Sequence, residues 1–433
     1  MDKIAIQGGA RLEGTIRVNG AKNAALPIMA ASLLADGPSA IDSLPDVVDV
    51  HTLIKVLETL GVRHERDGNA SITLEVVDHE PVTAPYDLVR QMRGSICVLG
   101  PLVARRGQAR VSLPGGCAIG VRPIDLHRKG LEALGAATTI EHGYVVASAA
   151  DGLRGSSIFL GGPFGSTVLG TANTLMAAAL ADGVTVIESA ACEPEIADLA
   201  LFLTNMGASI EGAGSPTMRI KGVRSLRGTR HTIIPDRIEA ATFMVAAAMT
   251  RGNVVIENIR LEHLGAVADI LRRAGAEVTP LGHDACRVVG PDKLTPVDVT
   301  TLPYPGVPTD VQAQLMAMLC IADGISVVTE KIYPDRFMHV PELQRMGAVL
   351  HKEGAAVIVH GVPALSGAQV MASDLRASAS LILAGLVAQG TTELSRVYHL
   401  DRGYERIEER LRAIGADIRR YDDGQEPTNK PKD

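Results

Sequence analysis

Apolar helical stretches that end at a glycine recur along the chain at a nearly constant interval. Successive glycines of this series are separated by 74, 72, 68, 72 and 68 residues. The segments read VLETLGV, LEALGA, LTNMGA, ILRRAGA, LQRMGA and LRAIGA, with their glycines at Gly61, Gly135, Gly207, Gly275, Gly347 and Gly415. Glycine readily adopts the left-handed conformation that follows the last turn of a helix, so each segment predicts a helix with a glycine stop.

A second glycine series alternates with the first. Its segments are LLADG, LVARRG, LADG, MTRG, IADG and VAQG, with glycines at Gly37, Gly107, Gly183, Gly252, Gly324 and Gly390. Extended, β-branched stretches such as VTVIES (184–189) and NVVIEN (253–258) follow them. The repeating unit is therefore about 70 residues of mixed helix and strand, and a fixed period of this kind means that the units share a core.

Six copies are compatible with one ring or with two globules of three. The segment RHTIIPDRIEAATF (230–243) lies between the third and fourth copies, and Pro235-Asp236 in it is typical of a hinge or a helix start. We therefore predict an α/β protein of two domains with three units each. The polar, proline-containing tail from Tyr421 is expected to be disordered.

Composition and charge exclude several classes of protein. The net charge is −7, so a nucleic-acid partner is not expected, and an anionic ligand needs a local cluster of cations. The five cysteines have no metal-ligand spacing and fit a reducing cytoplasm, with neither a metal nor a disulfide framework. The N-terminus lacks an apolar signal region, and no apolar run is long enough to span a bilayer, so we expect a cytoplasmic protein without a membrane partner.

The stretch VSLPGGCAIGVRPIDLHR (111–128) concentrates the candidate chemistry. Gly115 and Gly116 allow a tightly bent loop with Cys117 at its tip, and a helical pattern begins near Ile124. A thiol beside a cation and a helix start can have a lowered pKa and act as an acid or a nucleophile. The opposite interpretation, a buried structural cysteine, is equally compatible with this stretch alone.

Cationic side chains supply candidate anion sites. The turn Asn19–Asn23 leads into an apolar helix over 24–35, with Asn23 as a possible cap and Lys22 beside the helix start. Arginines lie in apolar or small-residue surroundings at Arg93, Arg122, Arg336, Arg376 and Arg402. Three of these follow an aspartate closely (Asp335, Asp374, Asp401), so structural Asp–Arg pairs are the alternative to an anion clamp. The alternative for Lys22 is a solvated lysine at an ordinary capped helix.

One carboxylate and one glycine-rich loop complete the candidates. The segment YPGVPTD delivers Asp310 to the start of an apolar helix, where it is either the helix N-cap or a group that orients or deprotonates a hydroxyl. The loop over 161–170 lacks the lysine of a P-loop, which disfavours nucleoside-triphosphate chemistry. His127 is expected on a helix surface rather than in catalysis.

Together these motifs resemble the UDP-N-acetylglucosamine 1-carboxyvinyltransferase family, the enolpyruvyl transferases that begin peptidoglycan synthesis. The resemblance covers about residues 1–420 and is carried by NGAKNAALP (19–27), LPGGCAIGVRPIDLH (113–127), EPEIADLA (193–200), PDRIEA (235–240), PTDVQAQ (308–314), DRFMHVPELQRMGA (335–348), SGAQVMASDLRASASLILAG (366–385) and YHLDRGYERIEERLRAIGA (398–416). Several long, ordered matches of this kind are far more specific than a lone glycine pattern.

The resemblance implies an inside-out α/β barrel with two domains of three βαβαββ repeats each. It implies that residues 1–21 and 235–420 form one domain, that residues 22–234 form the other and carry the catalytic loop 112–123, and that residues 421–433 are a tail. The implied substrates, phosphoenolpyruvate and UDP-N-acetylglucosamine, bind between the domains, which close on them. A monomer without a cofactor is expected.

The implied reaction moves the enolpyruvyl group to the 3′-hydroxyl of the sugar through a tetrahedral ketal and releases phosphate. By the resemblance, Cys117 is the general acid, can carry a phosphoenolpyruvate adduct and is the target of fosfomycin. Lys22, Arg122 and Arg402 match the groups that hold phosphoenolpyruvate, and Asp310 matches the base at the accepting hydroxyl. The remaining matched cleft and nucleotide-sugar residues are Asn23, Arg93, Pro123, Ile124, Asp125, Leu126, Thr167, Val168, Ile332, Arg336, Asp374 and Arg376.

One departure and two alternatives accompany the resemblance. Where the family reads Ser-Val-Gly near the uridine, this chain has Thr167-Val168-Leu169, so a side chain replaces a glycine at a ligand contact. The sister enzyme that acts on shikimate 3-phosphate shares the fold, but PGGCAIG and RPIDLH favour the nucleotide-sugar enzyme. A degenerate relative that only binds a nucleotide sugar and regulates is disfavoured by the joint presence of Lys22, Cys117, Asp310 and Arg402.

Overall fold

The computed structural model describes residues 2–68, 70–113 and 124–422. The chain folds into two compact units. Unit 1 comprises Met1–Val18, Arg237–Leu302 and Gly306–Asp433, and unit 2 comprises Asn19–Asp236 with Pro303–Pro305. Each unit has its own apolar core, and the chain passes between the units close to the predicted hinge at Pro235-Asp236.

Unit 1 contains three four-stranded sheets with the same internal order. The sheets are β2-β17-β19-β18, β20-β21-β23-β22 and β24-β25-β1-β26. In each, the first two strands are parallel and the remaining pairs are antiparallel. The elements of the unit are β1 Asp2–Gln7, β2 Glu13–Arg17, α8 Arg237–Met249, β17 Asn253–Glu257, η3 Leu261–Leu264, α9 Gly265–Arg273, β18 Glu277–Pro280, β19 Ala285–Val289, β20 Val299–Thr300, η4 Thr309–Val311, α10 Gln312–Leu319, β21 Ile325–Thr329, α11 Val340–Arg345, β22 Val349–Glu353, β23 Ala356–His360, β24 Gln369–Met371, α12 Leu375–Val387, β25 Thr391–Ser395, η5 Val397–Arg402, α13 Ile407–Ala413 and β26 Asp417–Asp422.

Unit 2 repeats this order in three further sheets, β16-β4-β6-β5, β7-β8-β10-β9 and β11-β12-β14-β13, and adds a short parallel pair, β3 with β15. Again a parallel pair opens each four-stranded sheet and antiparallel pairs complete it. The elements are α1 Lys22–Ala31, η1 Ser32–Leu34, β3 Ala35–Asp36, β4 Ser39–Asp42, α2 Val48–Thr59, β5 Val62–Arg66, β6 Ser71–Val76, β7 Thr83–Ala84, α3 Tyr86–Val89, η2 Arg93–Val98, α4 Leu99–Arg106, β8 Gln108–Ser112, α5 Asp125–Ala133, β9 Ala137–Glu141, β10 Tyr144–Ser148, β11 Ser157–Phe159, α6 Val168–Ala178, β12 Val184–Glu188, α7 Pro194–Met206, β13 Ser209–Glu211, β14 Thr217–Lys221, β15 Leu226–Arg227 and β16 Arg230–Thr232.

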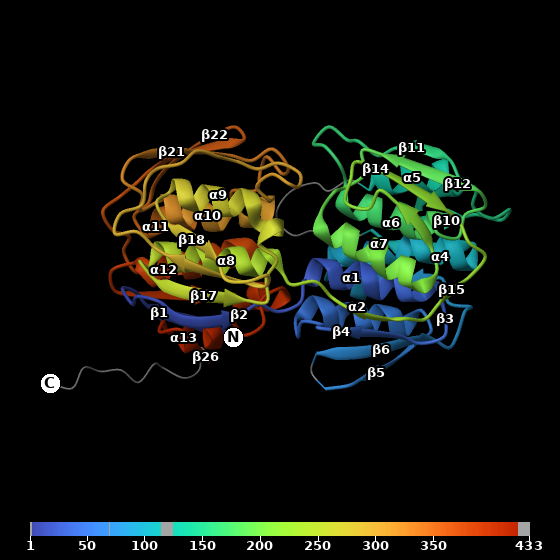
Figure 1. Cartoon of the computed structure of the whole chain (residues 1–433), viewed down its shortest axis with the longest axis horizontal. Helices are drawn as coiled ribbons and strands as arrows, with labels where there is room; N and C mark the ends of the chain where they lie inside the picture. Colours follow the sequence, from blue (N-terminus) through green and yellow to red (C-terminus); the bar gives the residue numbers. More distant parts are fainter. Residues whose placement is uncertain (1, 69, 114–123, 423–433) are drawn as a thin grey trace. The chain divides into compact units, whose positions relative to one another are not determined.

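Helices fill the interior of each unit. In unit 1, α8, α10 and α12 contact one another, every residue of α10 is buried, and α8 is buried from Ile238 to Met249. Figure 1 shows α8 and α10 between the strands β21 and β22 on one side and β1 and β26 on the other. In unit 2, α1 and α4 both pack on α6. Helices surrounded by protein need apolar residues on all faces, which explains their alanine-rich, unpatterned sequences.

The glycine stops behave as the repeat predicts, with one exception. All six glycines of the first series have positive φ, from 78° at Gly61 to 113° at Gly207. In the second series the left-handed residue is the glycine in five copies, but in the fourth copy it is Arg251, with φ 55°, rather than Gly252. The repeat is therefore confirmed, while a glycine need not occupy the left-handed position in every copy.

Two local predictions are wrong. Asn23 does not cap the first helix: α1 begins at Lys22, and its N-cap residue is Ala21, whose N–H donates to the Ile234 carbonyl. The chain also stays ordered beyond Tyr421, because β26 continues to Asp422 and pairs with β1. Residues 423–433 of the expected tail lie outside the described residues.

Candidate active site

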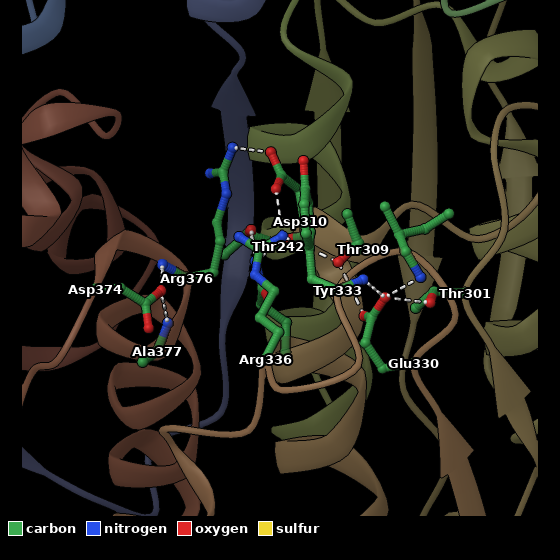
Figure 2. Close-up of polar contacts among 12 residues, drawn as sticks. Thr242, Thr301, Thr309, Asp310, Glu330, Tyr333, Arg336, Asp374, Arg376 and Ala377 are labelled. Atoms are coloured by element: carbon green, nitrogen blue, oxygen red, sulfur yellow. Dashed lines mark hydrogen bonds and ion pairs between the residues drawn. The ribbon is translucent and has the colours of Figure 1, made fainter. Parts of the chain in front are cut away.

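Two arginines hold the carboxylate of Asp310 in unit 1. Arg336 Nη1 donates to Asp310 Oδ1 at 2.8 Å, and Arg376 Nη2 donates to Oδ2 at 2.9 Å. The arginine side chains are only 8% and 5% exposed, whereas that of Asp310 is 25% exposed. Figure 2 shows the two guanidinium groups reaching Asp310 from separate segments of the chain. This cluster joins three of the residues that the sequence singled out.

The charges of this cluster determine the state of Asp310. Burial alone would raise the pKa of Asp310, but the nearby Arg376 and Arg336 outweigh that effect and hold its pKa well below the ordinary value. The pKa of Arg336 is raised in turn, because the attraction of Asp310 and Asp374 exceeds the cost of burial. Asp310 is thus an ionised hydrogen-bond acceptor at neutral pH.

The structure separates the alternatives left open for the aspartates. Asp310 is not an N-cap, since the cap residues of η4 and α10 are Pro308 and Val311. Asp374 is the N-cap of α12 and accepts from the backbone N–H groups of Arg376 and Ala377 at 2.9 and 3.1 Å. The guanidinium of Arg376 therefore binds Asp310, while the backbone N–H of Arg376 donates to its sequence neighbour Asp374.

The other two neighbouring aspartates also pair elsewhere. Asp335 lies 3.9 Å from Lys352, while its neighbour Arg336 binds Asp310. Asp401 accepts from both Nη atoms of Arg420 at 2.8 and 2.6 Å. Arg402 itself is half-buried. It is the last residue of η5, and η5 contacts α12. Burial, together with the charge of Arg402, lowers the pKa of His399.

Ile332 lies in a loop that is held by a residue the sequence analysis missed, Glu330. The N–H groups of Ile332 and Tyr333 both donate to Glu330 Oε1, at 2.8 and 2.9 Å. Glu330 is fully buried, directly after β21. A single acid after an apolar strand was the only signal available from the sequence, and its partners were not visible there.

Lys22 is anchored in unit 2 by a buried aspartate. Its Nζ lies 2.9 Å from Asp49 Oδ2, and the two side chains are 11% and 4% exposed. Asp49 lies in the first turn of α2, which packs on α1. Lys22 is therefore not a solvated lysine, and Asp49 is a second polar residue that the sequence analysis missed. Asn23, beside it in α1, is half-buried.

His127 is buried, contrary to the prediction of a surface position. It is 1% exposed, and its Nδ1 lies 2.9 Å from Asn173 Nδ2. Asn173 also bonds Ile96 O and Gly100 N–H, so it joins α5, α6, η2 and α4. Burial, aided by the charge of Arg93 at the start of η2, lowers the pKa of His127 to about 3, so its imidazole is neutral.

The predicted nucleotide-sugar residues of unit 2 lie at two helix starts. Ile124 is the N-cap residue of α5, followed by the exposed Asp125 and the half-buried Leu126. Thr167 caps α6 by accepting from Gly170 N–H at 3.2 Å, with Val168 as the first helical residue. Leu169, where the family has glycine, packs with Val168 against the apolar core of unit 2.

Cys117, Arg122 and Pro123, with most of the predicted loop 112–123, lie outside the described residues. The four described cysteines are unpromising nucleophiles. Burial raises the pKa of Cys97 and Cys320 to about 12 and that of Cys286 to about 11, and it also raises the pKa of Cys192. A raised pKa leaves little thiolate at neutral pH.

The described residues contain neither a metal-binding cluster nor a membrane-spanning helix. No group of three or more His, Cys, Asp or Glu side chains is placed there to hold a metal ion. Within the same ranges, no helix is both long and apolar enough to cross a bilayer.

Comparisons with known proteins place the chain in a family. A model of the family described as EPSP synthase (3-phosphoshikimate 1-carboxyvinyltransferase) matches residues 6–411. The enolpyruvyl transferase NikO from Streptomyces tendae has a TM-score of 0.87 at 29% identity, covering 97% of this chain and 98% of its own. An EPSP synthase from Acinetobacter baumannii, at 20% identity, shares the fold with a TM-score of 0.73 over 98% of this chain and 100% of its own.

These matches define an enolpyruvyl transferase fold and confirm the predicted fold class. Two relatives named UDP-N-acetylglucosamine 1-carboxyvinyltransferase are much more similar in sequence. That from an Anaeromyxobacter species is 55% identical over 423 residues, and that from Myxococcus xanthus 53% over 422, each covering 97% of this chain and 99% of the relative. The chain belongs to the family of UDP-N-acetylglucosamine 1-carboxyvinyltransferases, as its sequence motifs predicted, and is a transferase.

Proposed function

We propose that this protein transfers the enolpyruvyl group of phosphoenolpyruvate to the 3′-hydroxyl of UDP-N-acetylglucosamine, as the first committed step of peptidoglycan synthesis. The observation that carries the proposal is the 55% identity, over nearly the whole of both chains, to a relative with that name. The cluster of Asp310 with Arg336 and Arg376 supports it, because a carboxylate beside two buried cations suits a polar, anionic substrate.

The chemistry balances as an addition followed by an elimination. The sugar oxygen bonds to C2 of phosphoenolpyruvate, its proton passes to a base, and the methylene carbon gains a proton. The resulting ketal then loses phosphate and a methyl proton, which restores the double bond. We assign Cys117 as the acid that protonates the methylene, with an adduct of phosphoenolpyruvate on its sulfur as a side path.

The remaining roles follow charge and position. Lys22, Arg122 and Arg402 would neutralise the phosphate and carboxylate of phosphoenolpyruvate, and Lys22 would do so while bound to Asp49. Asp310 would accept a hydrogen bond from the sugar hydroxyl. We assign the substrate contacts to Asn23, Arg93, Pro123, Ile124, Asp125, Leu126, Thr167, Val168, Ile332, Arg336, Asp374 and Arg376.

The proposal also covers the domains, the substrates and the location of the enzyme. The two units are taken as the two domains of the enzyme, with phosphoenolpyruvate and UDP-N-acetylglucosamine as small-molecule partners. The reaction consumes no cofactor, so we propose that the enzyme is cofactor-free. We further propose that it is a monomer and that it acts in the cytoplasm, where phosphoenolpyruvate is made.

A phosphate-release assay tests the proposal. Phosphoenolpyruvate with UDP-N-acetylglucosamine should release one phosphate for each enolpyruvyl sugar detected by mass spectrometry, and Cys117→Ser should lose most of this turnover. Fosfomycin should add its mass to the wild type but not to Cys117→Ser. Release with shikimate 3-phosphate instead would indicate the sister activity. Binding of the sugar with no phosphate released would indicate a regulatory binding protein.

A further inference from the structure

Glu330 is a buried acid that accepts hydrogen bonds from several separate segments of unit 1. Thr301 Oγ1 lies 2.7 Å from Oε1, and Thr309 Oγ1 lies 2.9 Å from Oε2. The N–H groups of Ile332 and Tyr333 complete the set at Oε1. Glu330 has no exposed surface, so these four bonds replace its hydration (Figure 2).

The directions of these bonds are determined by the neighbouring donors. The hydroxyl of Thr301 accepts from Lys331 N–H at 2.9 Å, and that of Thr309 accepts from Arg336 Nη1 at 3.0 Å. Since both hydroxyls already accept, each has its own proton to give to Glu330. The side chain of Glu330 is therefore surrounded by donors and suits a carboxylate.

Two hydrogen bonds, through Thr309, link this carboxylate to the Asp310 cluster. Arg336 Nη1 donates both to Thr309 and to Asp310 Oδ1, so Glu330, Thr309, Arg336 and Asp310 form a continuous chain of hydrogen bonds. Thr309 also precedes Asp310 directly in η4. The same carboxylate thus constrains the backbone before Asp310, the guanidinium on it, and the amide of Ile332.

The repeats show that the fold does not require an acid here. Glu330 directly follows the second strand of its sheet, and the residues at the same place in the other five are Ser43, Leu113, Ser189, Asn258 and Arg396. Asn258 makes the corresponding link in its own repeat, where its Nδ2 donates to Val18 O at 2.6 Å. The other copies have a neutral side chain or a cation at this position, so an acid there is specific to the copy that contains Asp310.

We propose that Glu330 is a positioning residue that orders Asp310, Arg336 and the Ile332 amide for the sugar nucleotide. The inference rests on the proposed function, in which Asp310 and Ile332 contact UDP-N-acetylglucosamine. It predicts that a change at Glu330 alters kcat and the KM for UDP-N-acetylglucosamine more than the KM for phosphoenolpyruvate.

The test compares Glu330→Gln with Glu342→Gln. The amide oxygen at 330 can still accept three of the four bonds, while its NH2 group cannot accept from Thr309. We expect Glu330→Gln to lower kcat about tenfold and to raise KM for UDP-N-acetylglucosamine about tenfold, with KM for phosphoenolpyruvate within about twofold. Glu342 also accepts a backbone bond, from Met371 N–H at 3.0 Å, and Glu342→Gln should behave as wild type.

The Thr309→Val variant tests the same link from its other side. Thr309→Val removes only the link between Glu330 and Arg336. The double variant Glu330→Gln with Thr309→Val should have a kcat no lower than that of the less active single variant, because both changes break the same chain of hydrogen bonds. If Glu330→Gln does not fold, Thr309→Val decides by the same kinetic criteria. Kinetics within twofold of wild type, or equal changes in both KM values, would overturn the inference.

Hydrogen–deuterium exchange separates this inference from the proposed function. Amides in 306–314 and 330–336 should exchange faster in Glu330→Gln than in the wild type. If the wild type released no phosphate, the proposed function would fail, and faster exchange would still support the hold of Glu330 on these segments. Equal exchange in the two proteins would refute that hold whatever the activity.

Discussion

Asp310 illustrates a compromise at the level of one side chain. Arg336 and Arg376 hold its pKa well below the ordinary value, which keeps it ionised but makes it a weaker base. In the proposed reaction, Asp310 is therefore better suited to accept a hydrogen bond from the sugar hydroxyl and orient it than to take its proton.

The same arginines make Asp310 a measurable source of stability. We predict that Asp310→Asn lowers the free energy of unfolding by about 3 kcal/mol at pH 7, because it removes the charged carboxylate that both buried guanidinium groups bind. Since the folded pKa is lowered, this contribution is complete above the unfolded value of about 3.9 and is lost as the pH falls through the folded value. Urea denaturation should therefore give the same difference at pH 7 and pH 5, and a smaller one below about pH 3.9.

Asp335→Asn is the matched control for this change. Asp335 is 85% exposed and 3.9 Å from Lys352, so its loss should alter stability by less than about 0.5 kcal/mol. A difference between wild type and Asp310→Asn that already shrinks between pH 7 and pH 5 would contradict the lowered pKa.

Lys22 and Asp49 allow stability and binding to be separated. Lys22→Met should destabilise unit 2 by about 3 kcal/mol, since it removes the cation beside a buried carboxylate. Adding Asp49→Leu should restore most of that loss, because an apolar pair can replace a buried ion pair. Thermal unfolding reports the recovery, while the phosphate-release assay should find both variants inactive. Activity in the double variant would show that Lys22 serves only the fold.

Polar partners distant in the sequence were the residues that sequence reasoning could not find. The motifs singled out Lys22, Asp310, Arg336 and Arg376, but Asp49 and Glu330 have no local pattern. Asp49 lies 27 residues from Lys22, and Glu330 lies 29 residues from Thr301. Such pairings depend on tertiary packing, which also buries His127 against Asn173.

At the scale of helices and strands, periodicity was more informative than capping rules. The glycine stops predicted where the helices end, because a left-handed residue is a local requirement. The start of α1 was misplaced because Ala21 is held there by a bond to Ile234, more than 200 residues away in sequence. Helix ends that depend on local conformation can thus be predicted, and starts that depend on remote partners cannot.

Glycine substitutions test the requirement at helix ends. Gly207 has φ 113°, and an added Cβ would meet nothing within 4 Å, so Gly207→Ala should cost at least about 1 kcal/mol from backbone strain alone. Gly265 at the start of α9 has φ −49°, and its Cβ would also be in open space. Gly265→Ala should therefore stabilise the protein by about 0.4–1 kcal/mol. Equal effects of the two changes in urea denaturation would refute a special role for the left-handed glycine.

At the scale of the whole molecule, the sixfold spacing predicted the repeated unit, since each copy buries its helices against its neighbours. The described residues form three four-stranded sheets of one order in each unit. The pairing of β1 with both β25 and β26 was beyond the spacing argument, because the first strand of the chain completes the last repeat.

The proposed reaction divides its residues between the units, and this makes a prediction about the whole chain. Lys22 and Arg93 belong to unit 2, whereas Asp310, Arg376 and Arg402 belong to unit 1. If the proposed substrates engage both groups at once, we expect them to favour arrangements in which the units lie closer together, by as much as their affinity differs between arrangements. Small-angle X-ray scattering should therefore give a smaller radius of gyration with both substrates than without them, and Arg376→Ala should reduce the change. Superimposable profiles with and without saturating concentrations of both substrates would contradict closure of the units.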